Sequence, residues 1–150
     1  MPDESQIGME IDEVRFPVER GKVREFARSL GDPDPVHLDG GAASSAGFDG
    51  IPAPLTFGMV AMHWRDRDAM IEDLGFDFTR LLHGGVRWDY RRPVLVGEEL
   101  RATRRVADVK RRDGKRGGSM TFVTVETEFR DADGELAILQ VDTLIERGAP

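Results

Sequence analysis

The chain has 150 residues, a length that fits one domain with a core large enough to fold without disulfides or a structural metal. It contains no cysteine, which excludes thiolate zinc sites, thiol nucleophiles and disulfide bonds and is consistent with a cytoplasmic protein. The formal net charge of −7 argues against a nucleic-acid surface, and no apolar run approaches the roughly 20 residues that would span a membrane.

The first predicted element is an amphipathic helix over residues 19–30. Its apolar residues recur at the spacing of one helical face, and charged residues occupy the remaining positions. Gly31 follows as an expected C-terminal cap. The acidic segment before the helix lacks the cationic and apolar regions of a secretory leader. The apolar positions of the predicted helix are Val23, Phe26, Ala27 and Leu30.

A stiff acidic loop, GDPDPVHLD, follows at residues 31–39. Each of its two prolines fixes its own φ and restrains the residue before it, so the loop holds Asp32 and His37 in a fixed relation. Asp39 is predicted to cap a short helix over residues 40–46.

Residues 57–64, FGMVAMHW, have almost no polar face, so we predict a buried helix that becomes polar further on and ends at Gly75. Four predicted strands follow, and the turn sequences RDGKRGG and DADGE separate the last three. Helices followed by antiparallel strands indicate an α+β fold, one domain over residues 1–150, with the apolar helix on the concave face of a curved sheet. The predicted strands are VRWDYRRP, EELRATRRVADVKRR, SMTFVTVETEF and ELAILQVDTLIE.

Three chemistries could use the acidic loop. A calcium loop is excluded because Val36 and His37 occupy the third ligand position and the required glycine position. A transition-metal site is disfavoured because the three histidines are far apart in the sequence, and we predict no metal. Acid–base catalysis fits a histidine that titrates near neutrality, with Asp32 to orient it. On spacing alone, a turn-forming aspartate and a surface histidine are favoured over catalysis.

Three ordered segments carry a family pattern: FARSLGDPDPVHLDGGAASSAGF, GIPAPLTFGM and RRPVLVGEEL. With them the chain resembles the MaoC-like hot-dog-fold dehydratases and (R)-specific enoyl-CoA hydratases. The hallmark of that family is G-D-x-N-P, an aliphatic residue and then histidine, and residues 31–37 match it with Asp34 in place of asparagine. The likeness spans residues 15–146 and is nearest to the FAS1-like, or N-terminal MaoC, dehydratase branch, which shares the PAP-x-T-F and DGEL stretches.

The resemblance implies a hot-dog fold, in which an antiparallel sheet wraps around a long central helix. It also implies dimerisation through the sheets, as a homodimer or as a heterodimer with another hot-dog subunit. The substrate would be an acyl thioester of coenzyme A or acyl carrier protein, bound at the dimer interface without a further cofactor. The reaction would be the reversible hydration of trans-2-enoyl thioesters to (3R)-hydroxyacyl thioesters.

The same resemblance implies roles for particular residues. Asp32 and His37 would be the catalytic pair, with His37 removing the α-proton and Asp32 helping to expel the β-hydroxyl. Gly58 would offer its backbone N–H to the thioester oxygen, an interaction that also fits the unpaired amides at a helix N-terminus. An alternative role for this glycine is close packing of helix against sheet. The residues expected to border the substrate are Asp34, Pro54, Thr56, Phe57 and Met59.

Two departures from the family pattern bear on function. Asp34 replaces an asparagine, and Phe57 replaces a frequent histidine before the central glycine. Some members of the branch have lost the catalytic pair, so a non-catalytic subunit that binds acyl chains or stabilises a partner is the alternative function. A thioesterase is a third possibility, but that chemistry usually needs a carboxylate on or beside the central helix, and residues 57–64 have none.

Other polar and aromatic residues have weaker functional interpretations. The basic turn KRRDGKR at residues 110–116 could dock coenzyme A phosphates or an acidic carrier protein, but a solvated turn is favoured. His63 is predicted to be packed or hydrogen-bonded, and His83 to be a satisfied structural histidine. Trp88 and Tyr90 are predicted to lie in the core or on a dimer surface.

Overall fold

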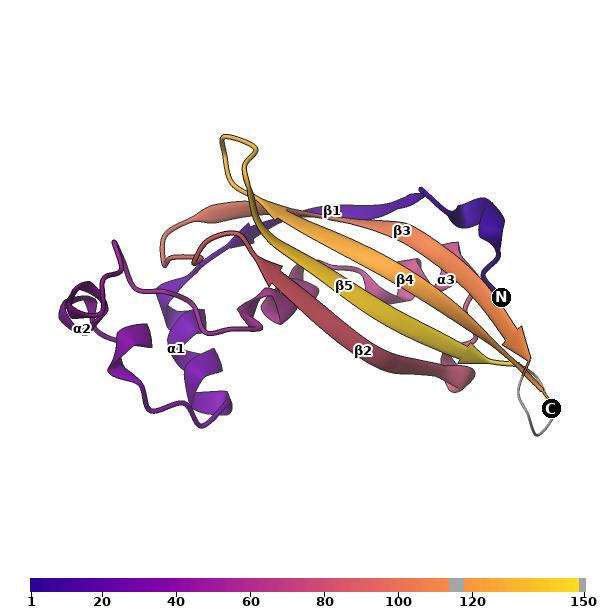
Figure 1. The fold of residues 1–150 in the computed structure, drawn as a ribbon, viewed down its shortest axis with the longest axis horizontal. Coiled ribbons are helices and arrows are strands. Elements are labelled where there is room, and N and C mark those ends of the chain that lie inside the picture. The colour runs from indigo at the N-terminus through magenta and orange to yellow at the C-terminus, as the bar shows by residue number, and fades with distance from the viewer. Residues whose placement is uncertain (114–117, 149–150) are drawn as a thin grey trace.

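The computed structural model describes residues 1–113 and 118–148, and its centre is one five-stranded antiparallel sheet (Figure 1). The strand order is β1-β3-β4-β5-β2, so three strands that are consecutive in the sequence form the middle of the sheet. Helices α1 and α2 lie beyond one end of the sheet, and both chain termini lie toward the other end. The strands are β1 (Glu10–Pro17), β2 (Leu81–Tyr90), β3 (Glu99–Asp113), β4 (Ser119–Arg130) and β5 (Leu136–Arg147).

The predicted α+β arrangement is confirmed, and the four predicted strands form as β2 to β5. Strand β1 was not predicted. The β1–β3 register shifts between Glu10 and Asp12. Ile11 therefore does not belong to the two-residue alternation of the later apolar positions, Val14 and Phe16. A bulge of this kind hides the alternation from a period-two pattern.

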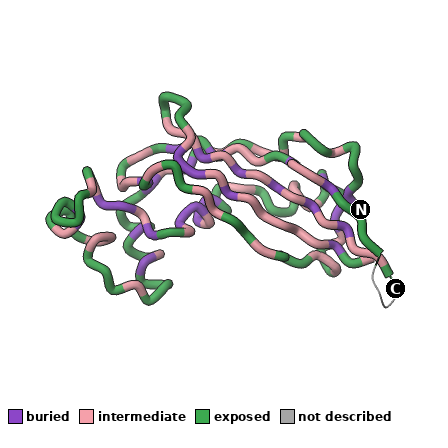
Figure 2. The backbone as a smooth tube through the Cα atoms, in the orientation of Figure 1, coloured by how far each residue is buried: buried purple, intermediate pink, exposed green. Residues whose placement is uncertain are grey.

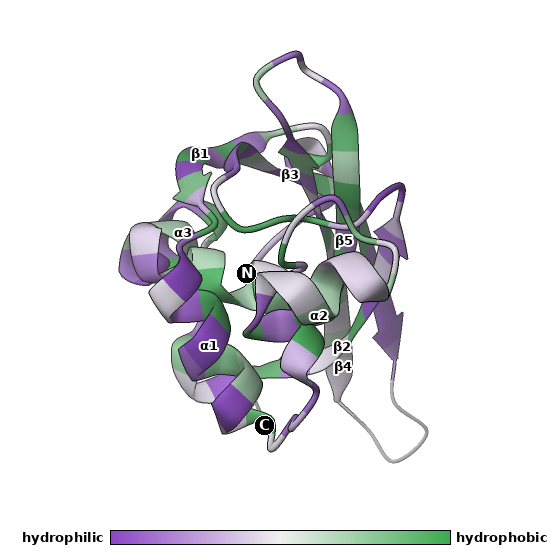
Figure 3. Ribbon diagram, turned by 90° about the vertical axis from the view of Figure 1, so that its left-hand side faces the viewer, coloured by the Kyte–Doolittle hydropathy of each residue, from purple (hydrophilic) through white to green (hydrophobic). Residues whose placement is uncertain are grey.

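Helices α1 and α2 flank the acidic loop, whereas α3 lies against the sheet toward its other end. Asp39 caps α2 as predicted, since its side chain accepts a hydrogen bond from the N–H of Ala42 at 2.8 Å. Figure 3 shows hydrophilic residues alternating with hydrophobic ones along α1, as the amphipathic pattern predicts. The helices are α1 (Arg20–Ser29), α2 (Gly40–Ser45) and α3 (Arg67–Leu74), with 3₁₀ turns η1 (Glu4–Gln6), η2 (Pro35–His37), η3 (Phe57–Trp64) and η4 (Phe78–Arg80).

The central helix differs from the expected long one, because it consists of two pieces. Residues 57–64 form the 3₁₀ helix η3, and the backbone of Arg65 is extended. A separate helix, α3, begins after its N-cap residue, Asp66. The Asp66 side chain accepts hydrogen bonds from two backbone N–H groups of α3, which favours a new helix start at this position. The extended backbone at Arg65 accompanies an ion pair between its guanidinium and Asp12 of β1.

The first part of this central segment is buried, but its end is not. Phe57, Gly58, Val60 and Ala61 are buried, which confirms the prediction for the start of η3. The expectation that the whole segment is buried is wrong, because Met62 is 59% and Trp64 is 37% exposed. The prediction rests on the near absence of polar residues in this segment, and such a composition does not reveal that the packing of η3 into the core ends near Ala61.

Two apolar clusters form the core, and Figure 2 shows the buried positions recurring along the strands and at η3. The larger cluster joins β1 and β4 to η3: the ring centroids of Phe16 and Phe57 lie 5.5 Å apart, and those of Phe16 and Phe129 lie 5.7 Å apart. This packing fixes the start of η3 against the sheet. Among the described residues, no helix combines the length and apolar character needed to span a bilayer.

Candidate active site

The loop after α1 is held by hydrogen bonds that its own aspartates accept. Gly31 adopts a left-handed φ of +68°, which turns the chain out of the helix, and the N–H of Asp32 then bonds to Ala27 O at 3.0 Å. Asp32 Oδ1 accepts from the N–H of Asp34, and Asp34 Oδ1 accepts from the N–H of Val36, each at 3.0 Å. Two consecutive side-chain turns therefore rigidify the loop together with its prolines.

The imidazole of His37 lies between Asp32 and the backbone of Pro52. Its Nδ1 is 2.8 Å from Pro52 O, and its Nε2 is 3.4 Å from Asp32 Oδ2. A carbonyl oxygen only accepts hydrogen bonds, so Nδ1 carries a proton and Nε2 faces the carboxylate. One further proton can then be shared between Nε2 and the Asp32 carboxylate. The pair is partly shielded from solvent, with side-chain exposures of 14% for His37 and 33% for Asp32.

Asp32, His37 and Gly58 border the same cavity, which has a volume of about 620 Å³. We call it the first cavity. Its walls are mainly apolar and come from β1, from the acidic loop, from the loop before η3 and from the connection between β2 and β3. This combination of a large apolar space with a few convergent polar groups is typical of a ligand site. Residues that contribute apolar wall are Phe16, Val36, Phe48, Leu55, Phe57 and Val94.

Gly58 has the structural features that each of its two suggested roles requires. Its backbone N–H has no acceptor among the residues that the structure describes, although Phe57 and Met59 on either side donate to Pro54 O and Thr56 O. Its Cα packs closely, because a Cβ placed there would lie 2.7 Å from Trp88 Cζ3 and 3.1 Å from Phe129 Cζ. The close packing explains why a side chain does not fit, and the free N–H leaves a donor for a ligand.

Gly58→Ala is expected to lower the free energy of unfolding by about 1–3 kcal/mol, because the added methyl overlaps Trp88 in a packed core. Urea denaturation measures the change. Gly21→Ala in α1 is the matched control: a Cβ there meets nothing within 4 Å, so this variant should be unchanged or more stable by up to about 1 kcal/mol. An equally stable Gly58→Ala would contradict the packing role.

Of the other residues expected to border the substrate, Asp34, Thr56 and Met59 do not line the first cavity. Pro54 and Phe57 line the first cavity. Asp34 is not among its lining residues and instead caps η2. Met59 points into a second cavity on the other side of η3.

Thr56 is held in an unusual conformation beside the first cavity. Its left-handed φ of +67° costs a non-glycine residue about 1–2 kcal/mol. Its N–H donates a 2.8 Å hydrogen bond to Tyr90 Oη, which anchors the turn into η3. Burial raises the pKa of this tyrosine. Tyr90 and its neighbour Arg91 both line the first cavity, and the alternation along β2 did not indicate that role.

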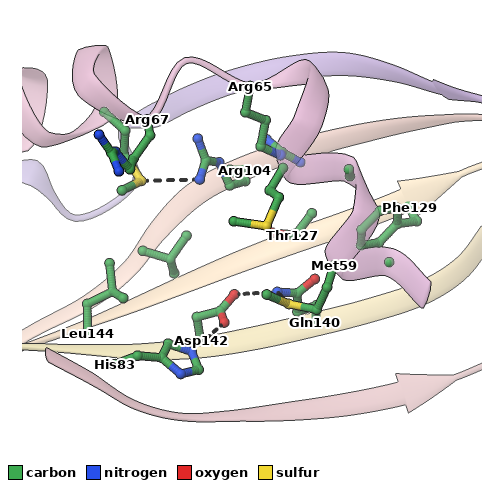
Figure 4. Close-up of a pocket in the computed structure, with 15 residues that line it drawn as sticks. Met59, Arg65, Arg67, His83, Arg104, Thr127, Phe129, Gln140, Asp142 and Leu144 are labelled. Carbon is green, nitrogen blue, oxygen red and sulfur yellow. Dashed lines mark hydrogen bonds and ion pairs between the residues drawn. The ribbon is translucent and has the colours of Figure 1, made fainter. Parts of the chain in front are cut away.

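The second cavity, of about 230 Å³, adjoins the first at Gly58, which lines both (Figure 4). Its charged and polar walls were not predicted. A usable signal exists in β5, where Gln140 and Asp142 occupy alternate positions in line with Ile138 and Leu144, two apolar residues that line cavities. Polar residues on the inward face of a strand indicate a cavity or a buried network.

The remaining sequence candidates fall outside the first cavity. His83 lies beside Asp142, with Nε2 3.0 Å from Oδ1, as a satisfied structural histidine should. His63 is exposed, so the expectation that it is packed is wrong. The tip of the basic turn, residues 114–117, lies outside the described residues. Within residues 1–113 and 118–148, no group of three His, Asp or Glu side chains is arranged to hold a metal ion.

Comparison with known proteins identifies relatives over nearly the whole chain. Residues 5–140 match the family model of the FAS1-like dehydratase domain region. A UPF0336 protein of Saccharopolyspora erythraea is 37% identical over 149 residues, which cover 97% of this chain and 92% of that protein. A UPF0336 protein of Clavibacter michiganensis subsp. michiganensis is 40% identical over 132 residues, covering 87% of this chain and 85% of the relative.

Solved structures share the fold. A chain of the C-terminally truncated HadBC (3R-hydroxyacyl-ACP dehydratase) complex from Mycobacterium tuberculosis superposes with a TM-score of 0.78 at 25% identity, covering 96% of this chain and 99% of that chain. A MaoC-like dehydratase superposes with a TM-score of 0.79 at 28% identity, and the match covers 97% of this chain but 43% of that longer chain. The expected hot-dog fold is confirmed, and the chain belongs to the FAS1-like dehydratase domain family.

Proposed function

We propose that this protein catalyses the reversible hydration of trans-2-enoyl thioesters to (3R)-hydroxyacyl thioesters. The observation that carries the proposal is the meeting of Asp32, His37 and the free N–H of Gly58 at one cavity. The similarity to a (3R)-hydroxyacyl-ACP dehydratase complex supports the same class of reaction. The carrier is coenzyme A or acyl carrier protein.

In the dehydration direction, the thioester oxygen accepts the N–H of Gly58. His37 Nε2 removes the α-proton while Nδ1–H stays bonded to Pro52 O, which fixes the tautomer and the ring orientation. Negative charge develops on the thioester oxygen, where a preorganised donor stabilises it. The C3–O bond then breaks, the double bond forms between C2 and C3, and the hydroxyl leaves as water with a proton delivered through the Asp32–His37 pair.

Hydration runs the same steps in reverse. The pair takes a proton from water, the resulting hydroxide adds at C3, and the imidazolium returns a proton to C2. Every proton in the cycle is assigned to Asp32, His37 or water. The proposal therefore needs no metal or organic cofactor besides the thioester carrier.

We further propose that the protein acts as a dimer that pairs through strand β2. Within the described residues, β2 is hydrogen-bonded to β5 along one edge only, and apolar side chains along it are exposed. An exposed apolar edge strand is a template for pairing with another sheet. The partner is a second copy or a related hot-dog subunit, and native mass measurement of the purified protein distinguishes them. The exposed apolar residues of β2 are Leu82, Val86 and Tyr90.

The purified protein alone should hydrate crotonyl-CoA, which is followed as loss of enoyl absorbance and by chiral analysis of the 3-hydroxybutyryl product. Formation of the (3R) product supports the proposal. An inert protein that becomes active only with a second hot-dog subunit would instead support the non-catalytic alternative. Release of free thiol without hydration would indicate a thioesterase and contradict the proposal.

A further inference from the structure

The second cavity has one wall formed by a cluster of charges from three segments. Asp12 of β1 pairs with Arg65 from the η3–α3 junction and with Arg104 of β3. The side chains of the two arginines are 6% and 14% exposed, so the cluster is largely removed from bulk water. Burial lowers the pKa of Arg65 to about 10. Charged groups held in such a place stabilise poorly unless each remaining donor and acceptor finds a partner.

One donor in this cluster lacks an oxygen partner. Arg104 directs Nε and Nη2 at Asp12, but its Nη1 lies against the thioether sulfur of Met70 at 3.2 Å. A thioether is a weak acceptor, so this guanidinium nitrogen can still donate a strong hydrogen bond to another group. Figure 4 shows Arg104 and Arg65 on one side of the cavity.

The facing wall supplies an acceptor. Gln140 Nε2 donates to Asp142 Oδ2 at 2.7 Å, and Asp142 Oδ1 lies 3.0 Å from His83 Nε2. The amide group of Gln140 is thereby oriented, and its carbonyl oxygen receives no hydrogen bond from any residue that the structure describes. The cavity thus offers a donor from Arg104 and an acceptor from Gln140 on facing walls.

The formal charges around the cavity already cancel. Arg65 and Arg104 balance Asp12 and Asp142 when His83 is neutral. The remaining charged lining residue, Arg67, is paired with Asp68 beside it. An added carboxylate would leave one negative charge in excess, whereas a hydroxyl, which both accepts and donates, would complete the hydrogen bonding without changing the balance.

We propose that the second cavity receives the far end of the substrate's acyl group, and that this end carries a hydroxyl. The inference rests on the proposed function, because it places the thioester carbon at Gly58, which lines both cavities. A hydroxyl there accepts from Arg104 Nη1 and donates to Gln140 Oε1. A methyl end would displace water from the same groups and leave them unpaired, which costs affinity.

Binding of unreactive saturated acyl-CoAs tests this inference without catalysis. Hexanoyl-, octanoyl- and decanoyl-CoA are compared by calorimetry with their terminal hydroxyl, ketone and carboxylate counterparts of matched length. At the length that reaches the cavity, the hydroxyl ligand should bind about tenfold tighter than the methyl-ended one, and the ketone, which only accepts, should bind less tightly than the hydroxyl. No preference at any length, or a preference for the carboxylate, would overturn the inference.

Substitutions in the second cavity test whether its residues cause the preference for a hydroxyl-ended acyl chain. Arg104→Met should remove the hydroxyl preference, and Gln140→Leu should reduce it, which keeps the test valid should the first variant fold poorly. Arg105→Met is the matched control, because this neighbouring arginine is exposed and pairs with Glu126 outside the cavity. A preference that survives both cavity variants would place the hydroxyl elsewhere and contradict the assignment.

The two proposals fail separately. Hydration of crotonyl-CoA without any preference for an oxygen-ended chain leaves the enzymatic function in place and refutes the inference about the acyl end. A clear hydroxyl preference in a protein that hydrates nothing supports the inference and refutes catalysis by this chain.

Discussion

His37→Ala and Asp32→Asn are each expected to lower kcat/KM for enoyl-CoA hydration by about 10²–10⁴-fold, the range for loss of a positioned acid–base group. Without the imidazole, the base proposed to take the α-proton is lost. With an amide at position 32, the pair can no longer share a proton with Nε2 of His37. Initial rates of absorbance loss measure the effect, and chemical denaturation of each variant should show a folded protein.

Matched controls separate catalysis from a general disturbance of the chain. His63→Ala and Asp49→Asn remove an exposed histidine and an exposed aspartate that do not line the first cavity, so both should keep the wild-type rate. Retention of full activity in His37→Ala would place the chemistry outside this pair and would end the catalytic assignment.

Phe16→Ala is expected to lower the free energy of unfolding by about 3–5 kcal/mol, the range for deleting a large buried ring. Phe16 is fully buried, and its ring packs against Phe57 of η3 and Phe129 of β4. The change leaves a void between the sheet and η3, which also loosens the segment that presents Gly58. Urea denaturation gives the stability, and the same variant should bind thioesters more weakly.

Phe78→Ala is the control for this core deletion. Phe78 is 58% exposed and stacks against the guanidinium of Arg67, so its removal should cost less than about 1 kcal/mol. Equal losses in the two variants would mean that the larger apolar cluster does not hold η3 in place.

The sequence predicts best where a local pattern decides the structure. The amphipathic spacing identifies α1, Asp39 caps α2, and alternation identifies most of the sheet. It fails at β1, where a register shift breaks the alternation, and at the junction after η3, where Arg65 is extended beside Asp12 from a distant strand. The extended backbone at Arg65 accompanies a contact with Asp12, which is too distant in the sequence for a local pattern to reveal.

The same division applies to the candidate site. Asp32 and His37 are five positions apart in one stiff loop, so their proximity follows from the sequence. The departure at Asp34 also has a local explanation, because a carboxylate caps η2 as an amide oxygen would. The second cavity, in contrast, is assembled from η3, the segment after it and strands β2 to β5, and its charges balance only when Asp12 of β1 pairs with two of its arginines.

The order of strands in the sheet has a consequence for how the molecule opens. The three middle strands are neighbours in the sequence, whereas β1 and β2 flank the segment that bears Asp32 and His37. Pairing of nearby segments closes shorter loops at a smaller entropic cost, so we expect the middle hairpins to form early and residues 32–58 to become ordered last. Native-state hydrogen exchange should then show that the amides of residues 32–58 exchange through openings of lower free energy than the amides of β4 do. Mild denaturant should therefore abolish turnover before the sheet unfolds.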